Sequence, residues 1–265
     1  MIRLPDKTLP NTAQQKLTLW QKSINALADF QARTAAAERK FASRNTPRNP
    51  TFKQVRATLA LMCSGARRCC YCEDSCADEV EHIKPKSRYP EEVFIWDNFL
   101  YACGLCNGPK NNKFAVFAAA SGLFTPLLRD AVTPPVPGEP VLINPRREDP
   151  LEFFGLDLLD TFEFRPRYRL TETARTRANY TIETLDLNRD VLKEAREIAY
   201  EDYASRLEAY IRQRDSGAAE DRLQRLVRQL QRKEKPAVWR EMQRRQHLLP
   251  DLQPLFAAAP EALQW

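Results

Sequence analysis

Apolar residues recur at helical spacing through the N-terminal part of the chain. Within residues 12–42 they return at i, i+3, i+7 and i+10, starting at Leu17, which predicts an amphipathic helix. The same spacing starts again at Phe52 and predicts a second helix. We expect this helix to begin near Thr51, whose hydroxyl can cap it, and to end before Gly65.

The pattern changes in the middle of the chain. Residues 107–117 are expected to form a helix. Seven prolines between residues 125 and 150 exclude helix through most of that segment. Residues 151–170 predict a short hairpin, because aromatic and polar residues alternate up to Phe164 and Pro166 then ends the strand.

Helical spacing returns in the C-terminal third, where we expect Asn188 to cap the longest helix. The predicted helices span residues 171–187, 188–214, 218–234 and 236–247. In the third of these, four apolar residues share one face: Leu223, Leu226, Val227 and Leu230. This face must pack on the chain's own helices or on another subunit, and we expect the region to serve largely for docking.

The predicted fold class is mainly α, of the α+β type, with a small core between N-terminal and C-terminal helices. We expect four segments along the chain. They are an N-terminal helical segment (1–50), a core (51–120), a proline-rich connection with a short hairpin (121–187) and a helical basic C-terminal region (188–265).

Charge and composition indicate the class of partner. The net charge is +6, and its excess lies between Arg206 and Arg245, so a polyanion is a plausible partner, although a solvated helix face also explains it. The longest uncharged run, residues 114–128, is too short to span a bilayer. The first residues lack the apolar region of a signal peptide. With an odd count of seven cysteines, these features predict a reduced, cytoplasmic protein without membrane partners.

Four of the seven cysteines fall at metal-binding spacing. Cys69 and Cys72 form one Cys-x-x-Cys pair, and Cys103 and Cys106 form another, so together they predict a tetrahedral zinc site. Cys76 is an alternative ligand, because its distance from Cys72 in the sequence is also permitted. A zinc ion with four thiolate ligands has no open position for water. We therefore expect this zinc to be structural.

Polar residues between and just after the two cysteine pairs are not needed to hold zinc. They are Glu81, His82, Asn98 and Asn107. Alone, His82 is more often an ordinary loop histidine or a substitute zinc ligand. Together with Glu81, Asn98 and Asn107, it is a candidate general base for phosphodiester hydrolysis. Glu81 and Asn107 offer the hard oxygen donors that suit Mg²⁺ or Mn²⁺.

The order of these residues resembles the zinc-stapled HNH endonuclease motif, whose fold is the ββα-metal core. The matching stretches are Glu-His-Ile-Lys-Pro-Lys-Ser (81–87), Asn-Phe (98–99) and Cys-Gly-Leu-Cys-Asn-Gly-Pro-Lys (103–110). Two departures are Glu81, where aspartate is commoner, and Asn107, where histidine is more familiar. The resemblance implies that Asn98 bonds the loop backbone and orients His82. Candidate phosphate contacts are Lys86, Arg88, Lys110 and Lys113.

Shorter stretches resemble one HNH subgroup, the PtuB-like nuclease subunit of Septu-type anti-phage systems, also found as an effector in retron operons. They lie at residues 69–73, 81–86, 143–145, 149–152 and 181–189. The resemblance implies a partner ATPase of the ABC class, and in a retron a reverse transcriptase with its RNA and DNA. A second copy of the chain is another candidate partner. DNA is the favoured substrate and RNA the alternative.

Two other functions remain open at this point. A stand-alone restriction-type or mobile-element HNH enzyme would cut DNA without a partner. A catalytically silent zinc-ribbon module would only bind. The combination of Glu81, His82 and Asn107 argues against the silent module, because binding alone does not require these three residues together.

Overall fold

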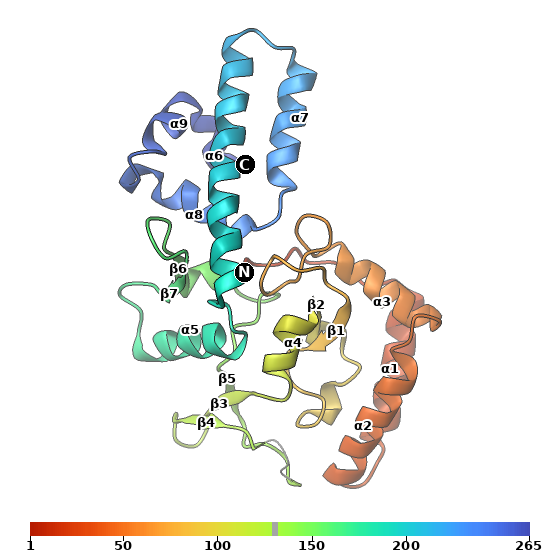
Figure 1. Ribbon diagram of the computed structural model, residues 1–265. Coiled ribbons are helices and arrows are strands. Elements are labelled where there is room, and N and C mark those ends of the chain that lie inside the picture. The colour runs from red at the N-terminus through yellow and green to blue at the C-terminus, as the bar shows by residue number, and fades with distance from the viewer. Residues whose placement is uncertain (129–131) are drawn as a thin grey trace.

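The computed structural model describes residues 1–128 and 132–265, and about half of these residues are helical (Figure 1). Buried apolar side chains from the first to the last of the four predicted segments belong to one contiguous core. None of the described helices combines the length and apolar character that crossing a bilayer requires.

The first 60 residues form three helices rather than the predicted two. They are α1 (Asn11–Asn25), α2 (Phe30–Arg44) and α3 (Pro50–Ala60). The single helix expected over residues 12–42 is wrong, because Asp29 interrupts it and caps α2 by accepting a hydrogen bond from Ala32 N at 2.7 Å. The cap of α3 is Asn49 rather than Thr51, and Pro50 occupies the first helical position.

The central part of the chain is a two-stranded antiparallel sheet followed by a short helix. Strand β1 (Glu79–His82) pairs with β2 (Phe99–Ala102), and α4 (Gly104–Lys110) follows directly. Helix α3 packs on β2, and α4 lies against β1. Figure 1 shows this unit between the N-terminal helices and the rest of the chain.

The helix predicted over residues 107–117 is wrong at both ends. It begins at Gly104, within the second cysteine turn, and ends at Lys110, because Asn111 has a positive φ of 39°. The chain then enters β3 (Ala115–Ala118), the middle strand of a three-stranded sheet. Its neighbours are β4 (Phe124–Pro126) and β5 (Gly138–Pro140).

The hairpin predicted within residues 151–170 is confirmed. Strands β6 (Phe154–Leu156) and β7 (Phe164–Pro166) pair antiparallel. The prediction that Asn188 caps the longest helix is wrong. Its side chain instead bonds both the N–H and the carbonyl of Phe164, at 2.8 and 2.9 Å, and so ties the hairpin to the start of the longest helix. Short 3₁₀ turns join these parts: η1 (Pro90–Glu92), η2 (Trp96–Asn98) and η3 (Pro150–Glu152).

The C-terminal region is a helical assembly around α6. The elements are α5 (Glu172–Thr184), α6 (Asp190–Asp215), α7 (Glu220–Gln231), α8 (Pro236–Arg245), η4 (Gln246–Leu248), α9 (Gln253–Ala258) and η5 (Pro260–Gln264). Helix α7 runs back along α6, while α8 and α9 lie on the other side of α6 (Figure 1). The apolar face of α7 packs on the chain's own core, where Leu230 is buried and Leu223, Leu226 and Val227 are half-buried. Most of this face is therefore covered by the chain itself.

A candidate active site beside a four-cysteine cluster

Four buried cysteines meet beside the β1–β2 sheet. Cys69 and Cys72 lie in the loop between α3 and β1, Cys103 is the N-cap residue of α4, and Cys106 lies in its first turn. Their sulfurs all lie within 4.8 Å of one another, and those of Cys72 and Cys103 are 3.8 Å apart. A tetrahedral zinc with bonds of about 2.3 Å places its sulfurs roughly 3.8 Å apart. The cluster can therefore hold a metal such as zinc.

The surroundings of the cluster distinguish its members from the other cysteines. Cys76 is exposed and lies outside the cluster, so it is not the alternative ligand.

Both terminal nitrogens of Arg189 lie 3.7 Å from Cys106 Sγ. Burial works against the charge of Arg189, but the sulfurs of Cys106 and Cys72 outweigh it and raise the pKa of the guanidinium. Arg189 is thus placed to stabilise negative charge on the thiolates.

His82 ends β1 and is held in one orientation. Its ring packs against Phe41 and Phe99, with centroid distances of 4.4 and 5.2 Å. Its Nε2 lies 2.9 Å from Val93 O. Because a carbonyl only accepts hydrogen bonds, Nε2 carries the proton and Nδ1 keeps its lone pair. Burial lowers the pKa of His82 to about 3, against the opposing effect of the bond to Val93, so the imidazole is neutral at pH 7.

Asn98 fixes the loop that supplies this carbonyl. Its Oδ1 accepts a hydrogen bond from Lys84 N at 2.8 Å. Its Nδ2 donates to Lys84 O at 3.0 Å and to Glu92 O at 3.1 Å. Since Val93 follows Glu92 directly, the Asn98 amide holds the backbone from which His82 receives its orientation.

Glu81 is a buried carboxylate paired with a buried ammonium. Lys110 Nζ lies 2.5 Å from Glu81 Oε1 and donates a hydrogen bond to His82 O at 2.8 Å. Burial raises the pKa of Glu81, although the charge and hydrogen bond of Lys110 oppose this. Lys110 is the last residue of α4 and is fully buried. It therefore joins α4 to β1.

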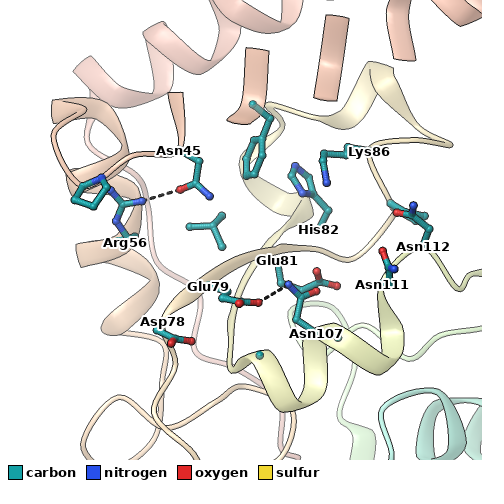
Figure 2. Close-up of a pocket in the computed structure, with 16 residues that line it drawn as sticks. Asn45, Arg56, Asp78, Glu79, Glu81, His82, Lys86, Asn107, Asn111 and Asn112 are labelled. Atoms are coloured by element: carbon teal, nitrogen blue, oxygen red, sulfur yellow. Dashed lines mark hydrogen bonds between the residues drawn. The ribbon is translucent and has the colours of Figure 1, made fainter. Parts of the chain in front are cut away.

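Asn107 is oriented by Glu79, an acidic residue outside the predicted site. Its Nδ2 donates a hydrogen bond to Glu79 Oε2 at 2.7 Å (Figure 2). A carboxylate can only accept, so this bond fixes which end of the amide faces Glu79 and leaves Asn107 Oδ1 available to a cation. The signal for Glu79 was its position two residues before Glu81, on the same face of a strand.

Glu79, Glu81, His82 and Asn107 line one open pocket of ≈ 620 Å³, whereas Asn98 and Lys110 lie outside its lining. Figure 2 shows His82, Lys86, Glu79, Glu81 and Asn107 around it, with Arg56 at its edge. Arg56 is held by Asn45 Oδ1 at 2.7 Å. Acidic and amide oxygens, a neutral imidazole and basic side chains therefore meet in the same space.

The four candidate phosphate contacts occupy different environments. Lys86 is half-buried and lines the pocket, and Lys113 is exposed just beyond α4. Arg88 is only 3% exposed and donates a hydrogen bond to Thr133 O at 3.0 Å. Arg88 and Lys110 therefore lie inside the protein, where they do not meet a phosphate. Lys86 and Lys113 remain accessible.

Comparison with known proteins gives a partial similarity. No protein-family model matches the chain. Over 57 residues the chain is 44% identical to the Septu protein PtuB of Bacillus thuringiensis. This similarity supports a Septu-related protein. The matched stretch covers 20% of this chain and 22% of the relative, so the similarity extends to about a fifth of either protein.

Proposed function

We propose that this protein is a metal-dependent HNH endonuclease that hydrolyses phosphodiester bonds of nucleic acid, with DNA favoured over RNA. The observation that carries the proposal is the environment of His82. Its neutral imidazole has a fixed tautomer and lines a pocket with Glu81 and Asn107. A silent binding module has no need for such an arrangement.

His82 acts as the general base. Its Nδ1 removes a proton from the attacking water, and the Nε2–H bond to Val93 O stabilises the imidazolium that results. A buried imidazole with a pKa of about 3 is a weak base in the free protein. A bound phosphate brings negative charge next to the ring and raises its basicity when the substrate is in place.

Glu81 and Asn107 would hold the catalytic cation. Their oxygens are the hard donors that Mg²⁺ prefers, and two protein donors leave positions for water and phosphate oxygens, as is usual for Mg²⁺. Bound there, Mg²⁺ supplies positive charge for the scissile phosphate and the leaving oxygen. Lys110 balances the charge of Glu81, and Glu79 keeps the oxygen of Asn107 available.

The zinc has a structural role in this proposal. Four thiolates leave no open position, so the zinc does not activate water. It holds the start of α4, whose Asn107 directly follows the ligand Cys106. The active site thus depends on the cluster for the position of α4.

The similarity to Septu protein PtuB supports a wider role for this endonuclease. We propose that it is the effector of an anti-phage defence complex in the cytoplasm, controlled by an ABC-class ATPase. A retron, with its reverse transcriptase and nucleic acid, is an alternative setting for the same subunit. A stand-alone enzyme differs from both in cutting without a partner.

Cleavage by the full-length protein tests the proposal. Supercoiled and linear DNA, and RNA, are incubated with the protein and Mg²⁺ or Mn²⁺, with and without the ATPase encoded beside it. His82→Ala should fold, retain zinc and lose cleavage by about 10²-fold or more. The matched control is His247→Ala, because His247 lies outside the pocket and should cut like the wild type. Full cleavage by His82→Ala would refute the mechanism.

A further inference from the structure

A second hollow lies away from the His82 pocket and is strongly basic. We call it the α7 groove. It is ≈ 610 Å³ in volume, and its basic lining residues come from the end of α6 to just beyond α7: Arg206, Arg225, Arg228, Arg232 and Lys233. The other lining residues are Gly65, Ala66, Gln229 and Glu234. None of the described residues that line the groove is aromatic.

The basic residues of the groove fall into two groups. Arg206 and Lys233 are each paired with Asp202, at 2.8 and 2.6 Å; the first pair lies within α6, and the second ties the chain just beyond α7 to α6. The side chains of Arg228 and Arg232 are exposed and make no ion pair or hydrogen bond within the described part of the chain. Their charges are therefore available to a ligand.

The exposed arginines share one helix face. Arg225, Arg228 and Arg232 are spaced i, i+3 and i+7, and they span about 10 Å at roughly 1.5 Å per residue. Arg225 has one ion pair, to Asp221 at 3.6 Å, and both side chains are well exposed. Such surface pairs contribute little to stability. Three like charges along one face repel one another, and a polyanion relieves this repulsion.

A close backbone contact joins the groove to the zinc-binding loop. Gly65 has a φ of 50°, and a Cβ added there would lie 3.2 Å from the backbone nitrogen of Glu234. Only glycine fits this approach without strain. Figure 1 shows the loop after α3 reaching the end of α7. The same loop continues through the exposed Arg67 to the first metal-binding cysteine.

Arg67 connects the groove with the catalytic pocket. Arg67 O accepts a hydrogen bond from Ala77 N at 2.8 Å, and the next residue, Asp78, lines the pocket that contains His82. Arg56 lines the pocket that contains His82, and Ala66, next to Arg67, lines the groove. Arg67 therefore lies between the two hollows.

We propose that Arg56, Arg67 and the α7 groove form a contact surface for the phosphate backbone of duplex nucleic acid bound at the His82 pocket. The inference rests on the proposed endonuclease function. One guanidinium group can donate two parallel hydrogen bonds to the oxygens of a phosphate, which suits a contact with the nucleic-acid backbone. Single strands are commonly held by stacking on aromatic residues, which the groove lining lacks, so a duplex fits better. Binding of this kind is independent of base sequence.

Binding of a fluorescent 30-base-pair duplex, measured by anisotropy across a salt series without added divalent metal, tests the surface. The test variant of the full-length protein is Arg225→Gln/Arg228→Gln/Arg232→Gln. Its charge-matched control is Lys16→Gln/Lys22→Gln/Arg240→Gln, whose three residues are also exposed and lie outside the groove. Thermal unfolding of both variants checks that the fold is unchanged.

The test variant should bind at least tenfold more weakly, with a salt slope reduced by about 2–3, whereas the control should stay within about twofold of wild type. Equal binding of the duplex by both variants would contradict the proposed contact surface. If the test variant binds duplex normally but fails to co-elute with the ATPase, α7 is a protein interface and the inference falls. If the wild type and the test variant both cut with the same KM, the endonuclease proposal stands and the proposed contact surface is contradicted.

His82→Ala separates the two proposals further. It should bind the duplex like the wild type without cutting it. If it still cuts, the active-site assignment fails, while the binding result for the α7 variant stands by itself. If the wild type neither binds nor cuts any nucleic acid, both proposals fail.

Discussion

The Lys110 ammonium lies 2.5 Å from Glu81 Oε1, and both side chains are buried beside the candidate active site. A second hydrogen bond, to His82 O at 2.8 Å, joins the same lysine to the end of β1. One side chain at the end of α4 therefore fixes the backbone of the proposed general base and the charge of the proposed metal ligand. A lysine with these partners is structural rather than a phosphate contact.

Replacing Lys110 should destabilise the fold. In Lys110→Met the carboxylate of Glu81 stays buried without its partner, and breaking a buried pair in this way costs about 3–5 kcal/mol. Lys113→Met is the matched control, because Lys113 is exposed, and it should change the free energy of unfolding by less than about 0.5 kcal/mol. Urea unfolding measures both. Equal stability of the two variants would contradict the structural role.

His82 should stay neutral far into the acidic range. Its pKa is lowered from the ordinary 6.5 to about 3, chiefly by burial. Between these values the unfolded chain binds one proton more than the folded protein. The contribution of His82 to folding stability is therefore lost as the pH falls from 6.5 towards 3, by up to about 1.4 kcal/mol per pH unit.

Imidazole NMR of ¹⁵N-labelled protein measures this pKa directly. The chain has two histidines, so a spectrum of His247→Ala identifies the His82 signals. We expect the His82 ring to remain in the Nε2–H tautomer at pH 5. Titration of that ring near pH 6.5 would show that it is solvated and not held by Val93.

The sequence predicted local features of this protein better than its long-range contacts. The two Cys-x-x-Cys pairs were recognisable because each spacing is set within one tight turn. The role of Lys110 was not, since its partner Glu81 is 29 positions earlier in the chain. Asn188 looked like a helix cap for the same reason, because its actual partner, Phe164, lies on a strand that only the fold brings near.

The predicted helix boundaries were wrong where contacts with distant parts of the chain determine where a helix begins or ends. The helix expected from residue 107 begins at Gly104, because the second cysteine turn is also the start of α4. Glu79 was missed because its partner Asn107 lies 28 residues away. The apolar face of α7 was correctly seen, but periodicity alone does not show whether such a face meets the same chain or another one.

The four-cysteine cluster should bind one zinc per chain. Cys103→Ser removes one thiolate from a buried site, so the protein should lose zinc and unfold at a lower temperature. Cys76→Ser is the control, because Cys76 is exposed and outside the cluster, and it should keep both zinc and stability. Elemental analysis with thermal unfolding tests the pair. Folded wild-type protein without zinc would refute the assignment.

The apolar face of α7 should act in folding rather than in assembly. Leu230 is only 2% exposed, and Leu230→Glu buries an unpaired carboxylate in the core beside α6. We expect it to lower the free energy of unfolding by about 3 kcal/mol or more. Gln229→Glu adds the same charge at an exposed neighbouring position and should cost less than about 0.5 kcal/mol. A Leu230→Glu variant with wild-type stability that no longer co-purifies with the ATPase would show that this face is an interface after all.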